Sequence, residues 1–115
     1  MRTFRIALAQ INPTVGDIDS NTDKIISYID RARELSVDLV AFPELAIPGY
    51  PPEDLLFKPQ FIQANIAKMR DVVAASAGIA VAVGFVDANS YVYNSAAIAQ
   101  NCELRGIYHK MYLPN

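Results

Sequence analysis

The sequence predicts an α/β protein with a mixed sheet and the element order βαβαβββ. Three observations predict it. Short runs of uninterrupted apolar residues are typical of strands covered on both faces. Segments with apolar residues every three or four positions, the helical period, separate the first three of these runs. Two final apolar segments joined by a tight connection indicate an antiparallel end. The 115 residues, 52% hydrophobic and 19% charged, suit a single domain, which typically has about 100 to 150 residues.

The first strand–helix–strand unit opens the chain. Residues 4–11 are apolar at nearly every position, which predicts a strand buried on both faces. Ser20 or Asn21 is expected to cap the helix that follows, and this helix should end near Ser36. Residues 39–42 form the second apolar run, so the unit should be a right-handed parallel crossover.

A loop rich in proline follows the second strand and delays the second helix. The residues that prevent regular structure there are Pro48, Gly49, Pro51 and Pro52. Pro52-Glu53-Asp54 is the predicted start of the helix, because proline suits the first helical position and carboxylates suit the positive end of the helix dipole. Gly78 should close this helix.

The last three predicted strands complete the sheet. Residues 79–86 form a third run that should be buried on both faces. Residues 91–100 and 104–110 should pair in antiparallel fashion through a tight connection at residues 101–103. Asp87 and Asn89 are expected to form the turn before this pair.

Composition argues against several classes of function. Ten Lys and Arg against twelve Asp and Glu give a net charge of −2, which offers no basic surface for nucleic acid or an anionic membrane. The single Cys102 cannot form an internal disulfide, and no Cys/His cluster suggests a metal site. No apolar stretch reaches the roughly 18 residues of a membrane span. We therefore expect a cytoplasmic protein without membrane or nucleic-acid partners.

Two charged residues occupy positions where α/β proteins bind ligands. The sequence contains neither a dinucleotide fingerprint, a phosphate loop nor a serine elbow, so position in the fold is the guide. Ligands bind beyond the carboxyl ends of strands. Glu44 follows the second predicted strand, and Lys110 ends the last one. Taken singly, each residue has the simpler interpretation of a solvated surface charge.

Their surroundings resemble a known family. Phe42-Pro43-Glu44-Leu45, Pro48-Gly49-Tyr50 and the segment His109-Lys110-Met111-Tyr112-Leu113-Pro114-Asn115 resemble the first two signatures of the nitrilase, or carbon-nitrogen hydrolase, superfamily. The opening residues 6–13 fit the same family. Residues 49–56 and 110–115 are similar to the branch formed by the amino-terminal glutaminase domains of NAD synthetases. The resemblance covers the whole chain.

The resemblance implies an αββα sandwich with a Glu-Lys-Cys triad. Glu44 matches the general base of the family, Lys110 matches its catalytic lysine, and Tyr50 would bind substrate near Glu44. The family's nucleophilic cysteine follows the lysine, whereas Cys102 precedes it, so Cys102 is not a candidate nucleophile. Residues 1–115 are therefore expected to be the N-terminal part of a carbon-nitrogen hydrolase domain, truncated before the nucleophile and inactive when isolated.

The implied reaction is the hydrolysis of glutamine to supply ammonia. A synthetase domain of the same parent chain would use ATP and Mg²⁺ to amidate deamido-NAD, while this segment itself would need no cofactor or metal. The resemblance also implies a homo-oligomer. Two alternatives stay open, namely a free-standing amidase for another small amide and a folded fragment without catalytic function. His109 is expected to be an ordinary strand residue and Cys102 a small turn or core thiol.

Overall fold

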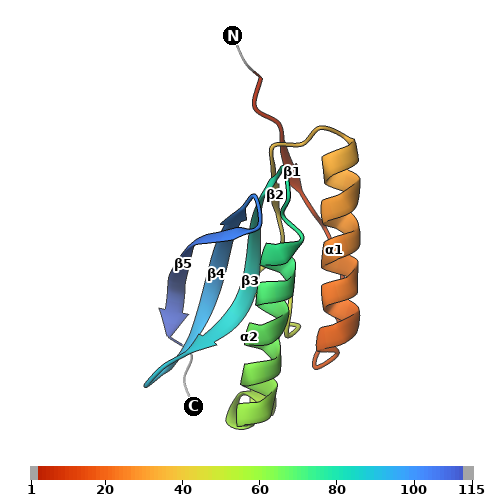
Figure 1. The fold of residues 1–115 in the computed structure, drawn as a ribbon. Helices are drawn as coiled ribbons and strands as arrows, with labels where there is room; N and C mark the ends of the chain where they lie inside the picture. The colour runs from red at the N-terminus through yellow and green to blue at the C-terminus, as the bar shows by residue number, and fades with distance from the viewer. Residues whose placement is uncertain (1–2, 113–115) are drawn as a thin grey trace.

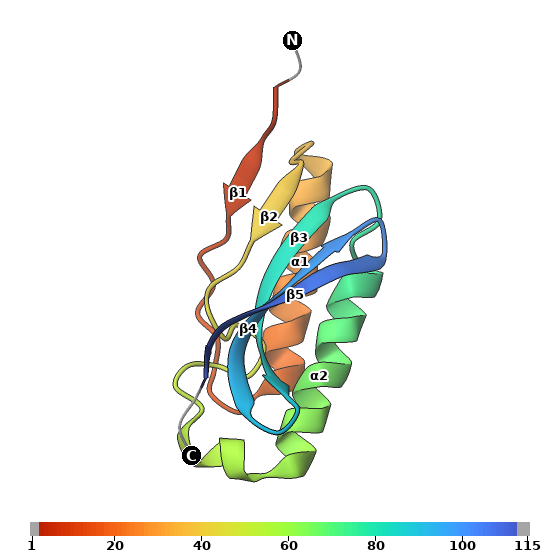
Figure 2. The same ribbon diagram turned by 90° about the vertical axis from the view of Figure 1, so that its left-hand side faces the viewer.

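The computed structural model describes residues 3–112, which form one five-stranded sheet with both long helices on the same face (Figures 1 and 2). The elements are β1 (Ile6–Leu8), α1 (Ile18–Glu34), β2 (Leu39–Ala41), the 3-10 helix η1 (Glu53–Phe57), α2 (Pro59–Ala74), β3 (Ala80–Ala88), β4 (Val92–Gln100) and β5 (Glu103–Tyr112). The predicted order is confirmed, with η1 as an addition.

The sheet is mixed, as predicted. Its strands lie side by side in the order of the sequence, β1-β2-β3-β4-β5. The pairs β1–β2 and β2–β3 are parallel, whereas β3–β4 and β4–β5 are antiparallel. The described residues thus supply one sheet and one layer of helices. Residues 113–115, the end of the family-like segment, lie outside them.

The prediction for the first strand is wrong in two respects. Only Ile6–Leu8 form β1, and the strand is not buried on both faces, since Ile6 is 58% and Leu8 76% exposed. Successive side chains of a strand point to opposite faces, and here both helices lie on one face. Ala7 therefore packs against the core while its two neighbours face away from it.

Helix α1 begins earlier than the predicted caps. The Asp17 side chain caps it by accepting a hydrogen bond from the Ser20 backbone N–H at 3.2 Å. The predicted end near Ser36 is close to the observed last residue, Glu34. The predicted start of the second helix is wrong, because Pro52-Glu53-Asp54 opens η1 instead.

Helix α2 takes Pro59 at its first position, which is the role that was predicted for Pro52. Lys58 interrupts the helical path with an extended backbone (φ −103°, ψ 108°), as expected for a residue that precedes proline. The helix ends at Ala74, before the predicted closing Gly78. Gly78 instead takes a left-handed conformation (φ 73°) in the turn that leads into β3.

The hydrophobic core lies between the two helices and the sheet. Its largest side chains, each at most 1% exposed, are Ile25, Ile29, Val40, Ile47, Met69, Val72, Val81, Val83 and Phe85. Within residues 3–112, no helix is long and apolar enough to cross a membrane. The core thus fixes β2, whose carboxyl end carries the Glu44 loop described below, and β3, against which that loop lies.

A buried asparagine ties two loops together at one end of the sheet. Asn21 in α1 is fully buried, and its side chain accepts from the Thr14 N–H and donates to the Thr14 carbonyl, each at 2.8 Å. It also donates to the Ile47 carbonyl at 3.0 Å. Asn21 therefore joins the loop after β1 to the loop after β2.

We expect Asn21→Ala to lower the free energy of unfolding by about 2 kcal/mol, because it removes the side-chain partner of the buried Ile47 carbonyl and of the partly buried Thr14 N–H. Urea denaturation would measure the loss. Gln63→Ala, on the exposed face of α2, is the control and should change stability by less than about 0.5 kcal/mol. Equal losses of stability in both variants would contradict the role of Asn21 in joining the two loops.

Candidate active site

The loop after β2 carries Glu44 across the neighbouring strand β3. The Phe42 N–H donates to the Ala82 carbonyl at 2.9 Å, and the Ile47 N–H donates to the Gly84 carbonyl at 3.1 Å. These two bonds hold both ends of the Glu44 segment against β3. The candidate base therefore stands on a loop that is anchored to the sheet.

Gly84 allows this loop to approach closely. A Cβ atom at position 84 would lie 2.4 Å from the Leu45 nitrogen and 2.7 Å from the Pro43 oxygen, both backbone atoms. Leu45 itself takes a left-handed backbone (φ 51°), which is uncommon for leucine, and its side chain is fully buried. The buried Leu45 and the absent side chain at Gly84 together fix the place of Glu44.

Lys110 reaches the same place through a β-bulge in β5. Asn94 pairs with Met111 and Ser95 with His109, so Lys110 is an extra residue without a partner in the ladder. Bulges re-aim side chains in this way. The Lys110 Nζ donates to the Glu44 Oε2 at 3.0 Å. The structure thus brings together the two charged residues that the sequence analysis singled out.

Asn94 is a third member of the site, and sequence reasoning missed it. Its Nδ2 donates to the Glu44 Oε1, across 50 positions of the sequence. Asn94 is only 2% exposed. A usable signal was present, because Asn94 and Ser95 interrupt an otherwise apolar strand. Without the strand register, however, nothing connected this amide with Glu44.

Electrostatics favour the ionised form of Glu44. The hydrogen bond from Lys110 lowers the pKa of the Glu44 carboxyl most, the bond from Asn94 and the Lys110 charge lower it further, and partial burial opposes them. The carboxylate is therefore charged at neutral pH. Because the folded-state pKa is lowered, the stabilisation from this pair is present at neutral pH and is lost only as the pH falls through that lowered value.

Stability alone does not account for the arrangement. The Lys110 and Glu44 side chains are 43% and 45% exposed, and ion pairs at such positions typically contribute about 0 to 1 kcal/mol. A loop anchored over a glycine and a bulged strand are needed to form this contact. The arrangement can take up a proton on a carboxylate beside a fixed positive charge.

Glu44 also lines two hollows of the surface. One, of about 440 Å³, is shared with Pro13 and Tyr50, and a smaller one, of about 90 Å³, is shared with Asn94 and Lys110. Tyr50 is 63% exposed, and among the described residues no hydrogen bond joins it to Glu44. Tyr50 therefore stands at the margin of the site, where it could contact a bound molecule.

The other residues singled out from the sequence lie away from Glu44. The His109 Nε2 lies 2.7 Å from the Asp87 Oδ2, and its ring stacks on Tyr93 with centroids 4.0 Å apart. The prediction that Asp87 forms a turn is wrong. Asp87 lies within β3, because this strand extends to Ala88. His109 has the packed, paired environment expected of a strand residue.

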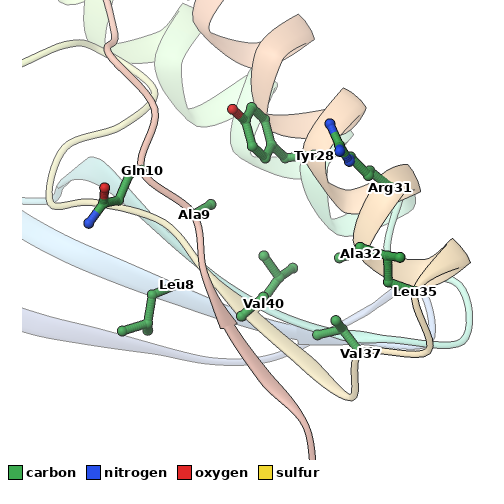
Figure 3. A pocket seen from close by; sticks show the side chains of 10 residues that line it. Leu8, Ala9, Gln10, Tyr28, Arg31, Ala32, Leu35, Val37 and Val40 are labelled. Atoms are coloured by element: carbon green, nitrogen blue, oxygen red, sulfur yellow. The ribbon is translucent and has the colours of Figure 1, made fainter.

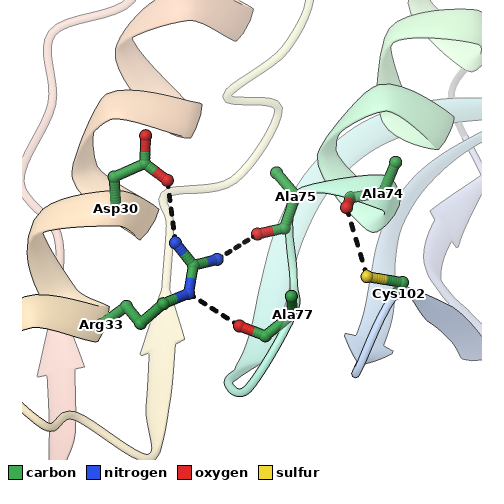
Figure 4. A network of polar contacts seen from close by, with 6 residues as sticks. All are labelled: Asp30, Arg33, Ala74, Ala75, Ala77 and Cys102. Atoms are coloured by element: carbon green, nitrogen blue, oxygen red, sulfur yellow. Dashed lines mark hydrogen bonds and ion pairs between the residues drawn. The ribbon is translucent and has the colours of Figure 1, made fainter.

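Cys102 lies at the opposite end of the β4–β5 hairpin from Lys110. It occupies the turn with Asn101, both residues having left-handed backbones (φ 66° and 51°). Its Sγ donates to the Ala74 carbonyl at 3.3 Å (Figure 4). Cys102 is therefore a turn thiol, remote from the pair formed by Glu44 and Lys110.

The neighbouring polar cluster around Arg33 is structural. Its guanidinium donates to the Ala75 and Ala77 carbonyls and pairs with Asp30 (Figure 4). These contacts tie α1 to the turn that follows α2.

A further hollow of about 360 Å³ lies between β1 and α1 (Figure 3). Its walls are mainly apolar, with Leu8, Val40 and Leu35 among them. Arg31, Gln10 and the hydroxyl-bearing Tyr28 are its polar lining residues. It contains no carboxylate and no thiol. Within residues 3–112, no three His, Cys, Asp or Glu side chains gather as a metal site would require.

Comparison with known proteins gives a consistent result. The family model described as Carbon-nitrogen hydrolase matches residues 5–115. A glutamine-dependent NAD(+) synthetase from Xanthomonas campestris is 46% identical over 98% of this chain and 21% of its own length. The crystal structure of a glutamine-dependent NAD(+) synthetase from Cytophaga hutchinsonii superposes with a TM-score of 0.92, at 29% identity, over 99% of this chain and 20% of that one.

Similarity of fold extends further. The crystal structure of an amidase from Nesterenkonia sp. has a TM-score of 0.81 at 24% identity, covering 97% of this chain and 44% of the amidase. The chain spans about a fifth of the length of the curated relatives that it matches.

Proposed function

The chain belongs to the carbon-nitrogen hydrolase family, and on that premise we propose that it forms the N-terminal part of the glutamine-hydrolysing domain of a glutamine-dependent NAD(+) synthetase. The observation that carries the proposal is the contact between the Lys110 Nζ and the Glu44 Oε2 at 3.0 Å. A carboxylate fixed beside an ammonium group suits acyl transfer from an amide. The identity to curated relatives of that name, up to 46%, supports the choice of substrate.

In this proposal Glu44 is the general base. The nucleophile is a cysteine of the parent protein that follows Lys110 in sequence and does not belong to residues 1–115. A thiol has a pKa near 8.5 in model peptides, so at neutral pH a base must take its proton as the sulfur attacks the carboxamide carbon. The Glu44 carboxylate accepts that proton and then passes it to the departing ammonia. Glu44 next deprotonates the water that cleaves the thioester, which releases glutamate and restores the thiol.

Lys110 stabilises the charge that develops during these steps. Attack on the carboxamide places negative charge on the former carbonyl oxygen, and a fixed ammonium group lowers the free energy of that state most effectively in a water-poor site. Its hydrogen bond to Glu44 also holds the base ionised before reaction. Tyr50, which shares the larger hollow with Glu44, is the proposed contact for bound glutamine.

ATP and Mg²⁺ act elsewhere in this proposal. The donor set at Glu44, a carboxylate already paired with an ammonium and an amide N–H, does not fit a cation. We assign ATP and its metal to a separate synthetase domain of the parent chain, where the released ammonia amidates deamido-NAD. No step at Glu44 depends on them.

Isotope transfer in the full-length protein tests the proposal. With glutamine labelled with ¹⁵N at the amide, deamido-NAD, ATP and Mg²⁺, we expect ¹⁵N in the NAD formed and one glutamate per NAD. Release of labelled ammonia without NAD formation would favour a free-standing amidase. Absence of glutamate formation, despite synthesis with free ammonia, would contradict the assignment. The isolated 115-residue chain should release no glutamate.

A further inference from the structure

We propose that Asn94 is the positioning residue of the base: it binds the Glu44 Oε1 so that Oε2 faces Lys110 and accepts the proton. The inference rests on the proposed function and adds a residue with a defined role to it. The observation behind it is a buried amide whose Nδ2 meets Glu44 on the oxygen that Lys110 does not contact.

The rigidity of Asn94 differs from that of the two groups beside it. Glu44 stands on a loop, and Lys110 has a flexible stem and no partner in the ladder. Asn94 instead lies within β4, paired with Val86 of β3 on one side and with the backbone of Met111 on the other. It is 2% exposed, whereas nearly half of the Glu44 side chain is exposed. Asn94 is thus the fixed point against which the carboxylate is oriented.

The side-chain oxygen of Asn94 is buried without a hydrogen-bond partner among the described residues, which indicates that the donor end of the amide determines its role. The Asn94 Oδ1 is buried and accepts no hydrogen bond from any residue between 3 and 112. A buried acceptor without a partner is unfavourable, so an apolar side chain of similar shape would suit the strand better. The hydrogen bond that its Nδ2 donates to Glu44 therefore accounts for the presence of an asparagine at this position.

The amide has only one orientation that fits this neighbour. Rotating it by 180° would set its oxygen against the Glu44 carboxylate, and two acceptors cannot form a hydrogen bond. The charged group that faces Glu44 is Lys110, on β5, and Asn94 adds a neutral donor from β4. Asn94 can therefore orient the carboxylate without competing for the ammonium group.

The test compares Asn94→Asp and Asn94→Ala with wild type in the full-length protein, with glutamine and with free ammonia as nitrogen donors. Aspartate keeps the shape of asparagine but replaces the donor by a second carboxylate. We expect kcat with glutamine to fall about 10- to 100-fold in both variants, with KM for glutamine little changed. Activity with ammonia should persist.

The pH profile separates positioning from loss of structure. Removing a donor from the ionised carboxylate should move the acid limb of the glutamine reaction to higher pH, and further in Asn94→Asp, where two carboxylates repel each other. Asn65→Ala is the matched control, since Asn65 is also fully buried but bonds the backbone of Val86. It should reduce stability without moving the limb.

The outcomes distinguish this inference from the proposed function. If wild type uses ammonia but not glutamine, the proposed function fails. If wild type uses glutamine, and Asn94→Asp keeps both its kcat and its acid limb, the positioning role is overturned. An equal loss across all pH values, shared by Asn65→Ala, would also overturn it, because it would show a structural role only.

Discussion

Glu44→Gln in the full-length protein is expected to lower glutamine-dependent activity by about 10³-fold while leaving ammonia-dependent synthesis unchanged. Glutamine has the shape of glutamate, but its single amide oxygen can replace only one of the two carboxylate oxygens that accept from Asn94 and Lys110. Its amide also cannot take a proton from a thiol or from water. Parallel rate measurements with the two nitrogen donors would show the effect. Loss of both activities would contradict separate sites for the two reactions.

Lys110→Met is the companion change and should give a loss of similar size with glutamine. It removes the positive charge near the developing oxyanion and the donor that keeps Glu44 ionised. Lys68→Met is the matched control, because Lys68 on α2 forms ion pairs with Asp19 and Asp71 and does not contact the site. If Lys68→Met impaired the glutamine reaction as strongly as Lys110→Met, the charge at Lys110 would have no special role.

Gly84→Ala is expected to lower glutamine-dependent activity about 10²-fold and stability by about 1 to 3 kcal/mol. The added methyl group would lie 2.4 Å from the Leu45 nitrogen, so the backbone on either side of Glu44 must move. Backbone on a loop that is bonded to β3 at both ends cannot yield as a flexible side chain would. Thermal denaturation and glutamine-dependent kinetics would measure the two effects.

Gly106→Ala provides the control for that change. Gly106 lies in β5, and a Cβ atom there would meet no atom of the described residues within 4 Å. It should therefore retain both stability and activity. Similar losses of stability and activity in both variants would indicate a general effect of replacing glycine in a strand. They would contradict a specific effect of the close approach of the Glu44 loop.

The sequence was informative where chemistry depends on local patterns. The apolar runs located β2, β3 and β4 to within about two residues. Glu44 and Lys110 could be singled out because each follows or ends such a run. The first strand and the start of α2 were mispredicted for a different reason. Ile6 and Leu8 are apolar but face away from both helices. Pro52 is followed by two carboxylates and so has the stronger helix-start signal, although α2 begins at Pro59.

The remaining members of the site depend on contacts between distant residues. Asn94 meets Glu44 only because β4 lies between β3 and β5 in a particular register. The need for glycine at position 84 arises from the path of another loop. A pattern in one segment carries no information on which side chain of another segment will face it.

The extra residue in β5 makes strand length as important as residue identity. Lys110 reaches Glu44 because it is an extra residue on β5 between the pairs of Ser95 and Asn94, and Arg105 is a second extra residue nearer the turn. Deleting one residue between positions 106 and 109 would shift Lys110 by one place along the ladder and turn its side chain to the opposite side of the sheet. Among descendants of this chain, conservative substitutions in β5 should therefore survive much more often than insertions or deletions.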